Sequence, residues 1–281
     1  MSINYDVFLR SFLQVVDIKL TTRNEHRTTK LILEEKSQII YGRHPIADAM
    51  RAGRALEKIW VQSDLRGEAE VEIRNLAKQY GVPIGIVPKE KMNKMAQGGN
   101  HQGLMALAAF VAYKNISDII PFVFEKGETP LILILDGITD VRNIGAIARS
   151  AEVLGVHAIV VPFANTALIN GDAVKTSAGA LNTISICREK SLSTTLDYLT
   201  QCGLQIVGSD LKAKKKLSEI DFLPPMVIVM GSEDEGISSG LMRKLNDRFI
   251  IPQLGVTDSL NVSVATGIIL YEAQRQRGFE R

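Results

Sequence analysis

The sequence predicts an α/β protein with two domains, of which the larger is built on a doubly wound parallel sheet. Short apolar runs alternate with amphipathic helical segments from about residue 38 to the end of the chain. Leu131 to Asp136 is a continuous apolar run, which is typical of a parallel strand covered on both faces. At 281 residues, the chain is also long enough for two domains of ordinary size.

Composition narrows the classes of function. The chain is 46% hydrophobic and 23% charged, and its net charge of +2 means that a nucleic-acid surface would have to be a local patch. Cys187 and Cys202 lack metal or redox spacing and are typical of a reducing cytosol. No apolar run approaches the roughly 20 residues of a membrane span, and the N-terminus lacks the order of a signal peptide. We therefore expect a cytoplasmic protein without membrane attachment.

The first 113 residues are predicted to form an extension and a small domain. Residues 1–36 are interpreted as a mobile extension, because 21–30 is polar and without apolar period; a partner-binding helix is the alternative. Residues 37–113 form the small α/β domain. Its predicted strands are 39–42, 58–61, 83–87 and 103–113, and its helices begin near Pro45 and cover 67–80 and 89–95. Residues 114–129, broken by Pro121 and Gly127, are predicted to be a linker.

Residues 130–281 are predicted to be the doubly wound domain. Its strands are expected at 131–136, 158–162, 184–187, 205–208, 226–231 and 249–252, and its helices at 143–154, 173–181, 193–202 and near Leu241. A long helix from Ser259 closes the chain, with Thr257, Asp258 and Ser259 as N-cap candidates. This helix carries Leu260, Val264, Ile268 and Tyr271 on one stripe, and Val262 and Ile269 off it. A helix that is apolar on more than one side is usually buried by more than its own sheet.

Polar and glycine residues follow three strands of the second domain, at 137–149, 231–236 and 252–263. Ligands of open α/β sheets bind at the carboxyl ends of strands, so this edge is the expected site. Neither G-x-G-x-x-G nor G-x-x-x-x-G-K-[ST] occurs, which argues against a dinucleotide fold and a P-loop. The four histidines lack metal-ligand spacing, so no metal site is predicted, and no Ser-His-Asp or Cys-His set is recognisable.

Five polar residues remain as candidates for catalysis: Asn143, Arg149, Glu233, Ser259 and Asn261. Asn143 and Arg149 are six residues apart, so they do not share a narrow helix face. We expect Asn143 at the helix entry and Arg149 deeper, reaching toward a neighbouring element. Each also has a structural interpretation, as a cap, a salt-bridge partner or a loop carboxylate.

Together, these segments resemble the SpoU (TrmH-type) RNA ribose 2'-O-methyltransferases of the SPOUT superfamily. The resemblance spans residues 130–275 and rests on three motifs in order. They are Asn143 with Arg149, then Gly231-Ser232-Glu233, then Pro252 with Ser259-Leu260-Asn261-Val262-Ser263; Ser177-Ala178-Gly179-Ala180 also fits. The first domain resembles the family's L30e-like RNA-binding domain through Tyr41-Gly42-Arg43-His44-Pro45 and Asn100-His101-Gln102-Gly103. Gln253, where relatives often have Met, is a small departure, and residues 1–36 lie outside the family pattern.

The resemblance implies a trefoil knot at the C-terminus, a homodimer and S-adenosylmethionine as cofactor. The residues implied to contact the cofactor, largely through backbone, are Met230, Gly231, Ile251, Ser259, Leu260 and Asn261. The implied reaction is methyl transfer to a ribose 2'-hydroxyl of a guanosine in 23S rRNA. A 2'-hydroxyl as nucleophile requires RNA and excludes DNA.

The donor is already activated, so the protein mainly has to position the reactants, which can supply roughly 7–11 kcal/mol. By resemblance, Arg149 activates the ribose hydroxyl. A guanidinium with a pKa above about 12 is a poor base, so we assign it a charge that stabilises the oxyanion or orients a phosphate. Asn143, Ser259 and Asn261 would fix the ribose and Arg149, and Glu233 would orient the site.

RNA binding also needs cations, and the sequence offers two groups. Lys212, Lys214, Lys215 and Lys216 form the densest cluster; the first domain offers Arg43, Arg51, Arg54, Lys89, Lys91 and Lys94. Lysine runs are more often solvated surface. The alternatives to a 23S rRNA enzyme are a tRNA guanosine methyltransferase, a non-catalytic RNA-binding protein on the same fold and, weakened by the missing glycine fingerprint, a dehydrogenase.

Overall fold

The computed structural model describes residues 39–256 and 259–280 and divides the chain into two compact units. Of the described residues, unit 1 contains 39–52 and Lys58–Ala108, and unit 2 contains Gly53–Glu57 and those from Ala109 onward. The predicted extension, 1–36, and the N-cap candidates Thr257 and Asp258 lie outside the described residues.

Unit 1 is a four-stranded sheet with helices, as the alternating pattern predicts. In the order β1-β4-β2-β3, the strands are β1 Ile39–Tyr41, β4 Leu104–Ala108, β2 Leu56–Gln62 and β3 Ile84–Val87. The helices are α2 Arg43–Arg51, α3 Glu68–Gln79 and α4 Lys89–Ala96. β1 pairs antiparallel with β4, and β2 pairs parallel with β3. The predicted strand 103–113 is shorter, because Tyr113–Lys114 forms a separate strand, β5, in the other sheet.

Unit 2 is built on an eight-stranded sheet in the order β10-β12-β9-β11-β6-β7-β8-β5, and all of its pairs are parallel. Its remaining strands are β6 Leu131–Asp136, β7 Ala158–Pro162, β8 Ser185–Glu189, β9 Gln205–Ser209, β10 Lys215–Lys216, β11 Met226–Gly231 and β12 Asp247–Ile250. The prediction of a parallel sheet is confirmed. The strand order reverses between β6 and β11, which makes this the topological switch point of the sheet.

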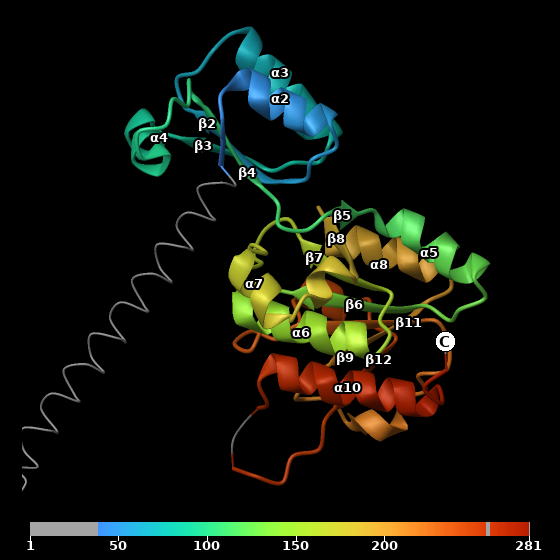
Figure 1. Ribbon diagram of the computed structural model, residues 1–281. Coiled ribbons are helices and arrows are strands. Elements are labelled where there is room, and N and C mark those ends of the chain that lie inside the picture. The colour runs from blue at the N-terminus through green and yellow to red at the C-terminus, as the bar shows by residue number, and fades with distance from the viewer. Residues whose placement is uncertain (1–38, 257–258, 281) are drawn as a thin grey trace, which may run out of the picture. The chain divides into compact units, whose positions relative to one another are not determined.

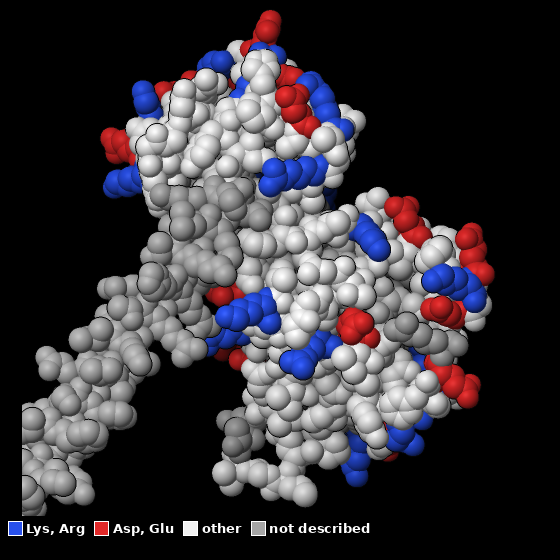
Figure 2. Space-filling model, viewed as in Figure 1, with Lys and Arg blue, Asp and Glu red and all other residues white. Residues whose placement is uncertain are grey.

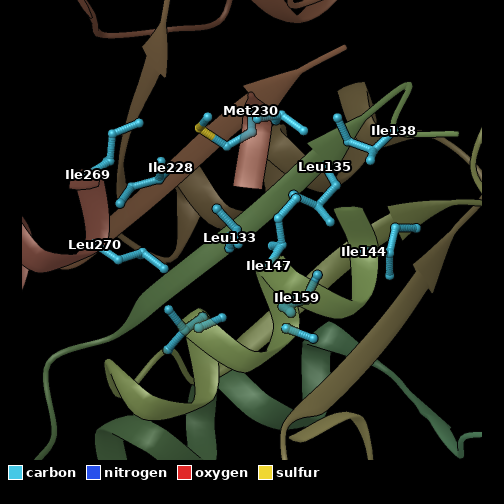
Figure 3. Close-up of a cluster of buried hydrophobic side chains, with 14 of the residues drawn as sticks. Leu133, Leu135, Ile138, Ile144, Ile147, Ile159, Ile228, Met230, Ile269 and Leu270 are labelled. Atoms are coloured by element: carbon cyan, nitrogen blue, oxygen red, sulfur yellow. The ribbon is translucent and has the colours of Figure 1, made fainter. Parts of the chain in front are cut away.

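Helices cover both faces of this sheet (Figure 1). They are α5 Ile116–Glu125, α6 Val141–Val153, α7 Gly171–Thr176, α8 Leu192–Gln201, α9 Ser239–Met242 and α10 Val262–Gln276. Side chains alternate between the faces along β6. Leu133 and Leu135 pack in one core cluster with α6 and α10, while Ile132 and Ile134 pack in another with α5 and α8. Figure 3 shows the first cluster, in which Leu133 lies among side chains of β11, α6 and α10.

No helix in the described parts of the chain is both long enough and apolar enough to cross a membrane.

The predicted linker, 114–129, instead contains helix α5. Pro121 lies inside this helix, where a proline costs about 3 kcal/mol. Four side chains at helical spacing, Ile116, Ile119, Ile120 and Val123, are buried against the sheet. Each buried aliphatic side chain contributes roughly 1.5–3 kcal/mol, so together they outweigh the proline.

Helix α10 also differs from its prediction in two respects. It begins at Val262 with Asn261 as N-cap, so Ser259 precedes the helix and does not cap it. The predicted stripe is the exposed one: Leu260, Val264, Ile268 and Tyr271 are 37%, 52%, 40% and 55% exposed. The core contacts come from Val262, Ala265, Ile269, Leu270 and Ala273. Apolar residues surround this helix, so the pattern alone does not select the buried face.

Candidate functional site

A cavity of about 460 Å³ opens at the carboxyl ends of β9, β11 and β12. It is lined by residues 209–212, 230–237, Met242, Arg248, Ile251, Gln253, 259–260, Val262 and Ala265. This is the edge that the sequence predicts, and the volume falls within the range of small-molecule sites.

A tight turn after β11 shapes one wall of the cavity. Ser232 and Gly236 face each other in an antiparallel bridge, and the Ser232 hydroxyl accepts a hydrogen bond from the amide of Glu235. A Cβ on Gly231 would lie 2.0 Å from the carbonyl carbon of Gly236 and 2.2 Å from the amide nitrogen of Ile237. Only glycine fits there, because both of these neighbours are backbone atoms. The turn places Glu233 in the lining of the cavity.

Glu233 accepts hydrogen bonds from two other segments through one oxygen, Oε1. The donors are Asn261 Nδ2 at 2.8 Å, the amide of Val262 at 3.2 Å and, more weakly, Asn143 Nδ2 at 3.4 Å. A carboxylate beside the first amides of α10 is stabilised by the helix dipole. Its other oxygen, Oε2, has no hydrogen-bond partner among residues 39–256 and 259–280, so it remains able to accept one from a ligand.

Asn261 connects the three segments. Its Oδ1 caps α10 by accepting hydrogen bonds from the amide of Ser263 at 3.0 Å and the Ser263 hydroxyl at 2.6 Å. Its Nδ2 donates to Glu233 and also to Asn143 Oδ1 at 3.0 Å. Every polar atom of this side chain therefore has a defined partner.

Asn143 enters this cluster from the first turn of α6. Asp140 caps that helix by accepting a hydrogen bond from the Arg142 amide at 2.7 Å. Two residues after Asn143, a Cβ on Gly145 would lie 2.7 Å from both the Ala173 carbonyl oxygen and Thr176 Cβ. The glycine lets α6 approach α7 closely, which fixes the position of Asn143.

The structure brings most of the predicted site residues to this edge of the sheet. Met230, Gly231, Glu233, Ile251, Ser259 and Leu260 line the cavity. Asn143 and Asn261 lie next to it, bonded to Glu233. Arg149 does not belong to this group: its side chain is exposed and makes no hydrogen bond or ion pair with any described residue.

Asp210, Lys212 and Arg248 also line the cavity, although sequence reasoning did not connect them with it. Asp210 and Arg248 form an ion pair at 3.0 Å. Asp210 could have been found from the sequence, because it is a polar residue directly after strand β9. The sequence does not show that β9 lies between β11 and β12 in the sheet, which places its end at the same cavity. Of the lysine cluster, Lys212 borders the cavity, whereas Lys215 pairs with Asp247.

The charge around the cavity is predominantly acidic. Its lining contains four carboxylates, Asp210, Glu233, Asp234 and Glu235, and two cations, Lys212 and Arg248. Over the molecule as a whole, acidic and basic side chains are interspersed on the face shown in Figure 2. Within the described ranges, no group of three or more His, Cys, Asp and Glu side chains could hold a metal ion.

Two family models match the chain, one for each unit. Residues 39–114 match the model for RNA 2'-O ribose methyltransferase substrate binding, and residues 130–271 match the SpoU rRNA Methylase family.

Individual relatives agree with these matches. YacO of Bacillus subtilis, assigned to the TrmH family of tRNA/rRNA methyltransferases, is 32% identical over 87% of this chain and 98% of its own length. The 23S rRNA (guanosine-2'-O-)-methyltransferase RlmB of Yersinia pestis is 34% identical over 87% of this chain and 99% of its own length. An AdoMet-bound rRNA methyltransferase from Sinorhizobium meliloti has a similar structure, with a TM-score of 0.54 and 25% identity over 84% of this chain and 86% of that one.

Proposed function

Because the chain belongs to the SpoU rRNA methylase family of RNA methyltransferases, we propose that it transfers a methyl group from S-adenosylmethionine to a ribose 2'-hydroxyl of RNA. The observation that carries this proposal is the meeting of Asn143, Glu233 and Asn261 at the edge of the cavity. Similarity to the RlmB enzyme favours a guanosine in 23S rRNA as the methylated nucleotide.

The cavity suits S-adenosylmethionine in two ways. Met230, Ile237, Met242, Ile251, Leu260 and Val262 supply apolar surface for an adenine ring. The four carboxylates supply negative charge for a ligand with a sulfonium and an ammonium group. When bound, the cofactor supplies an electrophilic methyl group on a sulfonium sulfur.

The residues of the chain then have to hold the ribose hydroxyl in line with that methyl group. Asn143 and Asn261 are already fixed by their mutual hydrogen bond and by Glu233, so they cost little reorganisation when RNA binds. We assign Glu233 the role of orienting these amides and of accepting a hydrogen bond at Oε2. Ser259, on the cavity wall, is the further hydroxyl available to the ribose.

We assign Arg149 the charge that stabilises the developing oxyanion or binds the neighbouring phosphate. Its exposed position on α6, outside the cavity lining, favours a site completed by a second copy of the chain. Helix α10 packs against α6, and its exposed residues Val264, Ile268 and Tyr271, with Leu260 just before the helix, form an apolar surface that such a copy would cover. We therefore propose a homodimer.

Two features of the fold complete the proposal. The chain leaves β12, which pairs with β9, and returns through residues 251–261 to place α10 against α6. This path supports the C-terminal trefoil knot that the family resemblance implies. The helices and four-stranded sheet of unit 1 support an L30e-like RNA-binding domain, and an RNA substrate of this kind implies a cytoplasmic enzyme.

Ribose methylation mapped over total RNA, with and without the gene, tests the function. We expect one 2'-O-methylguanosine in 23S rRNA to be lost, and purified protein with S-adenosylmethionine to restore it. Loss of a tRNA modification instead would assign the enzyme to tRNA. Unchanged methylation of all RNA, together with no calorimetric binding of S-adenosylmethionine, would overturn the proposal.

A further inference from the structure

Unit 1 offers RNA two different faces, and their charges distinguish them. Helices α2 and α3 pack against each other, whereas α4 lies apart from them (Figure 1). Together α2 and α3 contain four cations and four anions: Arg43, Arg51, Arg74 and Lys78 against Asp48, Glu68, Glu70 and Glu72. Helix α4 contains three lysines and one glutamate, a net charge of +2.

Ion pairing increases this difference. Glu72 pairs with both Arg43 and Arg51, and Glu70 pairs with Arg74. The lysines of α4, by contrast, have no ion-pair partner among the described residues. Phosphate binding would break existing pairs on the α2–α3 face but would meet uncommitted cations on the α4 face. Charge therefore favours the α4 face for RNA.

The α4 face also contains a hollow of about 540 Å³. Lys89 and Asn93 of α4 form one side, and Gln62 and Leu65 form another. The turn 98–103 forms the remainder with backbone and the polar side chains of Asn100, His101 and Gln102. A hollow lined by amide side chains and glycine backbone can accept both hydrogen bonds and the flat ring of a base.

Two contacts fix this turn before any ligand binds. The amide of Gly103 donates to His101 Nδ1 at 3.0 Å, so the ring proton lies on Nε2 and is donated to Asn93 Oδ1 at 2.7 Å. This orientation leaves Asn93 Nδ2 without a partner among the described residues, at the wall of the hollow. On the other side, Gly99 lies against the ring of Tyr41, where a Cβ would be 2.7 Å from Tyr41 Cζ.

The occupant follows from this chemistry and from the family match. The family match for RNA 2'-O ribose methyltransferase substrate binding spans residues 39–114 without locating the RNA contact within them. Paired bases present only their edges in a groove, whereas an open hollow of this size can receive the face of a base that is unstacked from its neighbours. Lysines beside it would hold the adjoining phosphates.

We infer that the hollow between α4 and the turn 98–103 binds an unpaired nucleotide of the RNA, with its phosphates on Lys89 and Lys94. The inference rests on the proposed function, because it assigns the RNA-reading site of that enzyme. Asn93 Nδ2 would donate to the base, whereas Asn75, an asparagine on the α2–α3 face, would make no RNA contact.

Full-length protein and four variants test this site with a 23S rRNA transcript, and with mixed tRNA as a second probe. Lys89→Ala with Lys94→Ala removes two charges from the α4 face, and Arg43→Ala with Arg51→Ala removes two from the α2–α3 face. We expect the first pair to weaken RNA binding about tenfold and to reduce the slope of log K against log salt by about 1.4, for two single-strand phosphate contacts. The second pair should change neither quantity.

Asn93→Ala tests the hollow itself, with Asn75→Ala on α3 as its matched control. We expect Asn93→Ala to weaken binding several-fold with an unchanged salt slope, because a contact to a base releases no counterions. A 4-thiouridine-substituted transcript should also form photocrosslinks to residues 89–103. Calorimetric affinity for S-adenosylmethionine should stay at the wild-type value in all four variants.

The outcomes separate this inference from the proposed function. Crosslinks confined to residues 43–79, or equal losses of RNA affinity in the two double variants, would contradict RNA binding in the hollow. They would leave the proposed methyl transfer intact. RNA binding that none of the variants changes would also overturn it, as would failure of both RNA probes to bind a protein that binds S-adenosylmethionine. Loss of cofactor binding and of methylation in the wild type would instead overturn the proposed function.

Discussion

The two ends of helix α10 are held by different kinds of contact. At its N-terminus, Asn261 and Val262 bond to the side chains of Asn143 and Glu233. At its C-terminus, the side chains of Arg277 and Gln276 bond to the backbone of other segments. Arg277 donates to the carbonyl oxygens of Phe222, Thr129, Pro130 and Pro224, and Gln276 donates to Ile220 and accepts from the amide of Phe222.

This difference separates the residues that hold the fold from those that form the site. Carbonyl oxygens belong to every residue, so the segments that Arg277 joins, before β6 and before β11, need no particular side chains as partners. The network at the N-terminus requires an amide and a carboxylate at defined positions. We therefore expect changes at the C-terminal end to reduce stability, and changes at the N-terminal end to reduce activity.

The largest effect is expected from Arg277→Ala. The variant leaves four carbonyl oxygens, three of them in partly buried contacts, without a charged donor, so the free energy of unfolding should fall by about 3 kcal/mol. The measurement is urea denaturation, with S-adenosylmethionine affinity measured on the folded protein and expected to be unchanged. Arg275→Ala is the matched control, because Arg275 is exposed and bonds only to Glu272; a similar loss there would contradict the role of the carbonyls.

Glu233→Ala should show the opposite behaviour. It removes the common acceptor of Asn143, Asn261 and the Val262 amide, so the single-turnover rate of methyl transfer should fall about 10²-fold. Stability should fall by only about 1 kcal/mol. Glu235→Ala, in the same turn, is the control: it removes a lining carboxylate that bonds to neither asparagine, so at saturating S-adenosylmethionine it should retain most of the rate. A wild-type rate in Glu233→Ala would remove this carboxylate from the proposed site.

Asn261→Ser sharpens the distinction within one residue. Serine caps helices as well as asparagine, so stability should stay within about 0.5 kcal/mol of the wild type. It lacks the amide that donates to Glu233 and Asn143, so the rate should fall roughly tenfold. Asn261→Ala should lose both the rate and about 1 kcal/mol of stability. If Asn261→Ser lowers the stability but leaves the rate of methyl transfer unchanged, Asn261 acts only as a helix cap.

The smallest effect concerns His157, which directly precedes β7, and the pH dependence of the free energy of unfolding. Burial lowers the pKa of His157 below its ordinary 6.5, and the charge of Arg277 adds to this. As the pH falls, His157 is therefore protonated at a higher pH in the unfolded chain than in the folded protein. The free energy of unfolding should be constant above about pH 6.5 and should decrease as the pH falls below it, by at most about 1.4 kcal/mol per pH unit.

His157→Asn should remove this part of the pH dependence, because asparagine can still accept from the Leu131 amide but does not titrate. Denaturation at pH 7, 6 and 5 is the measurement. An equal acid-dependent loss in this variant would assign the slope to other groups.

The sequence alone determined those elements whose pattern of apolar and polar residues fits only one kind of structure. The apolar run Leu131–Asp136 has to be covered on both faces, so it predicted a parallel strand, and the structure confirms it. Gly231, Glu233 and Asn261 were predicted as site residues from their places after strands and from the family resemblance, and the structure places Gly231 and Glu233 in the cavity lining and Asn261 beside it. Helical spacing placed α6 and α8 within two residues of their observed bounds.

Only the tertiary structure decided how these elements share surfaces. The apolar residues of α10 surround it, so the packing against α6 selected Ile269 and Leu270 as core and left Val264 exposed. Helix α5 forms despite Pro121 because burial on the sheet outweighs a local cost. Asp210 joined the site because β9 lies between β11 and β12. The reason is the same in each case: a local pattern records what a residue prefers, whereas the partner that satisfies it comes from a distant part of the chain.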